Sequence, residues 1–215
     1  GMRTLLFSCP LPLSNLTPMN ERESILDAAR LRLEKAVGSD SHAQDLLARF
    51  DRWGGDLFDG VAAVYEAKST INHLVDLIAK IHLERSGELR QRDMARILQP
   101  DWFQQSDAVG YVCYADLFAG DLSGIGKKID YLEELGITYL HLMPLLTPRP
   151  SPNDGGYAVQ DYKSIRKDLG SMKDLAKLAS KLHESGISLT LDLVLNHVAK
   201  EHEWALKARA GDKKY

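Results

Sequence analysis

Apolar residues recur at helical spacing through the first part of the chain. One set lies three or four residues apart, as on a single helix face: Ile25, Leu26, Ala29, Leu33 and Val37. Gly38 follows this set as a terminator, and Asn20 with Glu23 three residues later has the pattern of a capping box. The same periodicity predicts further helices over 41–53, 56–68, 70–86 and 91–98, separated by Gly54-Gly55 and Ser86-Gly87. We therefore predict a helical N-terminal domain over residues 1–105.

The pattern changes near Pro100, where continuous apolar runs replace the helical periodicity. Three such runs predict buried strands over 110–118, 137–143 and 187–195. Amphipathic helices are predicted between them, one over 123–135 and one that Ser171 and Asp174 open and Gly186 ends. Buried strands that alternate with helices predict an α/β domain over 106–215, with a parallel sheet covered by helices.

A long loop over 144–170 separates the second predicted strand from its helix. Loops of this length inside a compact domain are often functional. The loop contains Asp154-Gly155-Gly156-Tyr157, where the two glycines permit tight turns or positive φ. Tyr157 is interpreted in two ways, as an anchor that holds the loop or as an aromatic face for the apolar side of a sugar ring.

Composition narrows the class of protein. The chain has 215 residues, 44% of them apolar and 27% charged, with a net charge of −3, as in an ordinary globular protein. Lysine and arginine are dispersed, so we expect no nucleic-acid partner, and no apolar run is long enough for a membrane span. Gly1 resembles a tag remnant, and Pro10 and Pro12 interrupt a short apolar start that would be poor as a signal peptide. With two cysteines far apart, Cys9 and Cys113, we expect a cytoplasmic protein.

Polar residues follow the third predicted strand abruptly. Asp192, Asn196 and His197 stand where the apolar run ends, and active sites of (β/α)₈ barrels lie at the C-terminal ends of strands. A buried carboxylate is costly unless it is hydrogen-bonded, so Asp192 is either a structural residue bonded to a neighbouring loop or one that orients polar groups at the strand end. His197 has the same two interpretations, structural and functional.

Two other segments have residues that suggest a phosphate-binding or a zinc motif, but their spacing does not match either motif. Residues 120–128 follow a strand and open a helix, but Lys128 replaces the Ser or Thr of a phosphate loop and Ile129 replaces the third glycine of a dinucleotide motif. His197, Glu201 and His202 miss the zinc-protease spacings by at least one position. We expect no metal and no cofactor.

The segment from Asp192 to His197 resembles the first conserved region of the α-amylase family, Asp-x-x-x-Asn-His. From about residue 100 onward, the chain is similar more specifically to the amylosucrase and sucrose-hydrolase members of that family. The matching stretches are 101–103, 110–116, 118–122, 135–144, 154–159, 169–170, Asn196-His197 and 201–205. The helical first half is compatible with the helical N-terminal domain of those enzymes.

The resemblance implies a fold, an activity and residue roles. The fold is a helical N-terminal domain followed by the first three βα units of a (β/α)₈ TIM-type barrel, which is incomplete here. His197 would hydrogen-bond the glucosyl ring, Tyr157 would stack beneath it, and Asp154 would lie at the pocket floor beside an Arg from a later part of the chain. Asp192 and Asn196 would shape the strand end. Sucrose would be cleaved by a retaining mechanism, and the glucosyl group would pass to an α-glucan or to water.

The family's two catalytic carboxylates come from later barrel strands, and no Asp or Glu here is assigned to either role. We therefore expect the N-terminal portion of an amylosucrase-like glycoside hydrolase or glucosyltransferase that is inactive as given. The alternative is a non-catalytic carbohydrate-binding or interaction protein derived from such an enzyme. What the gene encodes after Tyr215 distinguishes the two. An incomplete barrel would also leave sheet edges open, which favours self-association.

Overall fold

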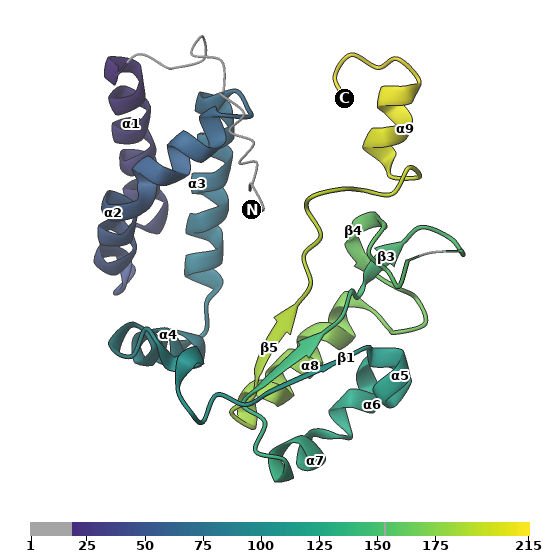
Figure 1. The fold of residues 1–215 in the computed structure, drawn as a ribbon. Coiled ribbons are helices and arrows are strands. Elements are labelled where there is room, and N and C mark those ends of the chain that lie inside the picture. Colours follow the sequence, from purple (N-terminus) through teal and green to yellow (C-terminus); the bar gives the residue numbers. More distant parts are fainter. Residues whose placement is uncertain (1–18, 153) are drawn as a thin grey trace, which may run out of the picture. The chain divides into compact units, whose positions relative to one another are not determined.

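The computed structural model describes residues 19–152 and 154–215, and Figure 1 shows the path of the chain. The chain divides into two compact units, Gly1–Ile97 and Leu98–Tyr215, each with its own apolar core. The signal-peptide-like start and Cys9 lie outside the described residues. Among the helices in the described ranges, none has both the length and the apolarity needed to cross a membrane.

Helices make up the described part of the first unit: α1 (Met19–Val37), α2 (Ala43–Ala62), α3 (Ala67–Glu84) and α4 (Gly87–Leu98). Helix α1 packs against both α2 and α3. The core between them contains Ala29, Leu33, Phe58, Ile71 and Val75, each with at most 1% of its surface exposed. The helical periodicity of this region is therefore the signature of a shared apolar core.

Two local predictions in this unit are wrong. Gly54-Gly55 does not separate two helices, because α2 runs through both residues. A Cβ at Gly54 would lie 3.2 Å from the Phe50 ring, and one at Gly55 would lie 2.9 Å from Nη2 of Arg22. The glycines thus allow close packing within a continuous helix. Asn20 is not a cap, since α1 already includes Met19.

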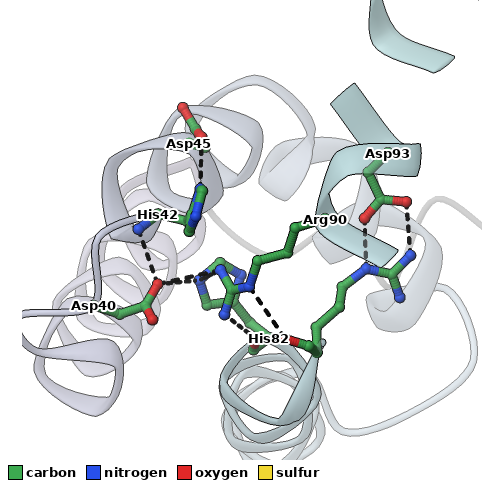
Figure 2. Close-up of polar contacts among 7 residues, drawn as sticks. Asp40, His42, Asp45, His82, Arg90 and Asp93 are labelled. Carbon is green, nitrogen blue, oxygen red and sulfur yellow. Dashed lines mark hydrogen bonds and ion pairs between the residues drawn. The ribbon is translucent and has the colours of Figure 1, made fainter. Parts of the chain in front are cut away.

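Helix α4 has no buried residue and is held to the unit by polar contacts (Figure 2). Asp40, which precedes α2, lies 3.0 Å from Nε2 of His82 on α3 and accepts a 3.3 Å hydrogen bond from Nη1 of Arg90 on α4. Arg90 also donates to the backbone oxygen of His82 at 2.7 Å. Hydrogen bonds from the His42 amide and from His82, with the charge of Arg90, lower the pKa of Asp40. This network joins α3 and α4 to the turn before α2.

The second unit contains a parallel sheet of the order β1-β2-β5. The strands are β1 (Gly110–Cys113), β2 (Tyr139–Leu142) and β5 (Ser188–Leu191), and Gly110 pairs with Tyr139, which pairs with Ser188. The helices of this unit are α5 (Ala115–Ala119), α6 (Leu122–Gly126), α7 (Ile129–Glu134), α8 (Met172–Glu184) and α9 (Glu203–Arg209), with a short 3₁₀ turn, η2 (Trp102–Gln104). Leu140 and Leu142 of β2 are fully buried in a core that also contains Leu132 and Leu182 of the helices.

The predicted start and end of the last long helix are confirmed. Ser171 accepts a hydrogen bond from the Asp174 amide, and the Asp174 carboxylate accepts one from the Ser171 amide, so the capping box forms. Gly186 follows the helix with φ 74°, a conformation that favours glycine. The sequence pattern therefore located both ends of α8.

Three predicted elements of this unit are wrong in part. Residues 115–119 form α5 rather than the end of the first strand, because a short apolar run fits a buried helix as well as a strand. The helix predicted over 123–135 is two helices. Helix α6 ends at Gly126 and α7 begins at Ile129, while within α6 a Cβ at Gly124 would lie 1.9 Å from the Ala119 oxygen at the end of α5. The loop predicted over 144–170 contains an antiparallel hairpin, β3 (Leu146–Pro148) and β4 (Val159–Ile165).

The third predicted strand is also too long. β5 ends at Leu191, and the side chains of Leu193 and Leu195 are 65% and 75% exposed rather than buried. The chain leaves the sheet at Asp192, whose carboxylate bonds to side chains of β2 and of the hairpin loop. Polar contacts thus end the strand before the apolar run ends.

Candidate functional site

The candidate site begins where β2 and β5 end side by side. Leu142 pairs with Leu191, so the residue after β5, Asp192, lies next to the end of β2. The loop between β3 and β4 brings Tyr157 to the same end of the sheet. The carboxyl ends of parallel strands form such sites because the strand-to-helix loops meet there.

Asp192 connects the two strands and the loop. Its Oδ1 lies 3.0 Å from Nε2 of His141 in β2, and its Oδ2 accepts a 3.0 Å hydrogen bond from the Tyr157 hydroxyl. Both carboxylate oxygens are thus partnered, which offsets the cost of withdrawing the charge from water. Burial, and then the hydrogen bond and charge of Asp192, raise the pKa of Tyr157. The phenol therefore stays protonated as a donor at neutral pH.

A hollow of about 390 Å³ adjoins this cluster. Its lining comes from the hairpin loop and from the segment after β5: Tyr157, Asp192, Leu193, Val194, Asn196 and His197. The structure therefore brings together four of the five residues predicted for the site. Asn196 and His197 are exposed at its rim, where their polar groups are accessible to a ligand.

The fifth predicted residue, Asp154, does not line the hollow. Its Oδ1 accepts a 2.8 Å hydrogen bond from the Ala158 amide, so it closes the turn that presents Tyr157. Gly155 and Gly156 have φ of 80° and 96°, as the sequence predicted for this turn. A Cβ at Gly155 would also lie 2.8 Å from the Tyr114 hydroxyl.

Two residues of the site were missed by the sequence analysis. His141 was placed in an apolar strand, although a histidine among apolar residues near a strand end is itself a signal for a polar partner. Tyr162 of β4 was assigned to a loop, yet its hydroxyl donates to the backbone oxygen of Val194. His202, considered above for zinc, accepts a hydrogen bond from the Trp204 amide at the start of α9.

Comparison with known proteins identifies the class. Residues 97–215 match the alpha-amylase family model described as the alpha amylase catalytic domain. Because the match covers more than half of the chain, this chain belongs to the alpha-amylase family, and its second unit is a fragment of that family's barrel. The family predicted from residues 192–197 is confirmed.

Several proteins of known activity are similar to the second unit. An oligo-1,6-glucosidase from Bacillus cereus is 39% identical over 127 residues, covering 55% of this chain and 22% of the relative. A glucan 1,6-alpha-glucosidase from Streptococcus dysgalactiae subsp. equisimilis is 43% identical over 91 residues, covering 42% and 16%. The solved trehalose-6-phosphate hydrolase from Bacillus licheniformis is 35% identical with a TM-score of 0.46, covering 52% and 21%. The chain spans about a fifth of the length of such relatives.

Proposed function

We propose that residues 97–215 supply the first part of the catalytic barrel of an enzyme that acts on α-glucosides. The hollow beside the His141–Asp192–Tyr157 cluster would hold the glucosyl ring. The observation that carries this proposal is that hydrogen bonds fix Asp192 and Tyr157 next to His197, around a hollow at the end of a parallel sheet. The family membership and the α-glucosidase relatives support the substrate class.

The residues of the hollow suit a sugar ring. The hydroxyl of Tyr157 bonds to Asp192 and the residue lines the hollow, where its aromatic face would pack against the C–H groups of a glucosyl ring. The exposed imidazole of His197 offers a hydrogen bond to a ring hydroxyl. Asn196 and Asp192 would shape the rim, and Asp154 would hold the turn below Tyr157.

The finer proposal is an amylosucrase-like enzyme that cleaves sucrose by a retaining mechanism. The family resemblance supplies the two steps: a carboxylate forms a covalent glucosyl intermediate, and a second carboxylic acid protonates the leaving group and then activates water or an acceptor glucan. Both carboxylates would come from strands beyond the three parallel ones described here. We therefore propose that residues 1–215 alone do not turn over sucrose.

Assays of two proteins test this proposal. The complete protein that carries this chain should release fructose from sucrose or glucose from isomaltose, and NMR should find the first-formed glucosyl product in the α configuration. The 215-residue polypeptide should release neither sugar above a protein-free control. Sustained release by the polypeptide, in proportion to its concentration, would refute its inactivity. A complete protein that binds these sugars without cleaving them would support the non-catalytic alternative.

The sheet edges give a further prediction for the 215-residue polypeptide. Among the described residues, β1 and β5 each pair on one side only. Three leucines at and beyond the end of β5 are exposed, at 40%, 65% and 75%: Leu191, Leu193 and Leu195. We expect the polypeptide to associate as its concentration rises, because an open apolar edge pairs with another chain. Light scattering measures this. A monomer at all concentrations would contradict it, and Leu193→Lys should weaken the association.

A further inference from the structure

We infer that the β3–β4 hairpin positions the segment carrying Asn196 and His197, and that Tyr162 and the Arg149–Glu201 ion pair are its positioning residues. The inference rests on the proposed function of that segment. After β5 the chain has no regular secondary structure until α9, and the exposed side chains of Leu193 and Leu195 do not hold it to the sheet. Besides the buried side chains of Val194 and Ala199, polar contacts with the hairpin fix its path.

Tyr162 makes the first contact with this segment. Its hydroxyl donates a 2.5 Å hydrogen bond to the backbone oxygen of Val194 and lies 3.3 Å from that of His197. These two carbonyl groups flank Asn196, so one phenol holds the backbone on both sides of it. Burial raises the pKa of Tyr162, so the phenol stays protonated and keeps donating. The ring is also fixed, since it packs edge-on against His202 with centroids 5.7 Å apart.

A second and third contact follow along the segment. The Ala199 amide donates a 2.9 Å hydrogen bond to the oxygen of Val159, the first residue of β4. Two residues later, Oε1 of Glu201 lies 3.3 Å from Nη2 of Arg149. The Arg149 amide donates to the Ala158 oxygen at 2.9 Å, next to Tyr157. The hairpin therefore holds the segment from Val194 to Glu201 and the residue beside Tyr157 in one frame.

The Arg149–Glu201 ion pair is expected to add little to the stability of the fold. Within the described ranges, Nε of Arg149 and Oε2 of Glu201 are buried and have no hydrogen-bond partner. A partly buried pair with unsatisfied atoms gains little over apolar packing, because both charges lose hydration. A positioning role explains the ion pair better. The pair fixes the segment at Glu201, as Tyr162 fixes it at Val194. In the proposed enzyme, this frame sets the spacing between Tyr157 and His197 across the glucosyl ring.

Removal of a single oxygen atom tests the inference. Tyr162→Phe keeps the ring but removes the hydrogen bond to Val194, and the control Tyr131→Phe removes a hydroxyl from a tyrosine that is 45% exposed on α7. On the complete protein, hydrogen exchange should become several-fold faster at the amides of 194–202 in Tyr162→Phe, with the melting temperature of the control. Arg149→Gln and Glu201→Gln should also make exchange at these amides faster. Exchange in the double variant should be no faster than in either single variant.

Kinetics of the complete protein supply the second readout. Tyr162→Phe should lower kcat by about 10-fold to 10²-fold, with a smaller change in KM, because misplacement of a transition-state contact reduces the rate more than binding. Exchange and kcat equal to those of Tyr131→Phe would overturn the inference. A wild-type protein without α-glucosidase activity would refute the proposed function instead, and the exchange result would still decide whether the hairpin positions the segment.

Discussion

Replacement of His197 by alanine is expected to lower kcat/KM of the complete protein on an α-glucoside by about 10²-fold or more, the effect of losing one oriented transition-state contact. The side chain is exposed at the rim of the hollow, so its removal should leave the fold intact. His73→Ala is a matched control, because His73 is exposed on α3 in the other unit. Wild-type turnover by His197→Ala would show that the family's role does not apply at this position.

Two variants of Tyr157 test the roles of its ring and of its hydroxyl separately in the same assay. Tyr157→Ala removes the aromatic face and should cost about 10²-fold in kcat/KM. Tyr157→Phe keeps the face and removes only the hydrogen bond to Asp192, so its loss should be smaller. Equal losses in the two variants would contradict a stacking role for the ring. A lowered melting temperature in both would favour Tyr157 as a loop anchor.

Phe58→Ala is expected to have the largest effect on stability in the first unit. Phe58 is 1% exposed in the helical core, and truncation of a buried phenylalanine costs about 3–5 kcal/mol through lost burial and the cavity that remains. The control Phe103→Ala removes a side chain that is 55% exposed and should cost little. Both losses are measured by urea denaturation followed by circular dichroism.

The same variant tests whether the two units are independent domains, as we propose. Peptide-resolved hydrogen exchange along the urea titration should show the transition of 19–97 shifted to lower urea and that of 98–215 unchanged. An equal shift in both regions would mean that the chain unfolds as one cooperative unit, and would contradict the division into domains.

The features that were predictable from the sequence are those that depend on neighbouring residues. The capping box of Ser171 and Asp174 and the turn at Gly155 and Gly156 are local, and the structure confirms them. The third parallel strand was predicted in the right place, but its end was set at Leu195 rather than at Leu191. The helical spacing before Pro100 likewise predicted helices, although their bounds differ from those expected.

The remaining features depend on contacts between distant segments. Asp192 pairs with His141, 51 residues earlier, and nothing local to either residue encodes that contact. Leu193 and Leu195 resemble core residues, so the apolar run concealed the end of β5 at Leu191. The hairpin over 146–165 escaped prediction because its strands are short or mixed in polarity and pair mainly with each other. The frame around Asn196 and His197 could therefore be found only in three dimensions.

A crystal structure of the complete protein with bound glucose tests the central proposal most directly. The account predicts a glucosyl ring in the hollow beside Asp192, with one face on the Tyr157 ring and a hydroxyl within hydrogen-bond distance of the His197 imidazole. It would be contradicted by glucose bound at another site, or by glucose in the hollow that contacts neither Tyr157 nor His197.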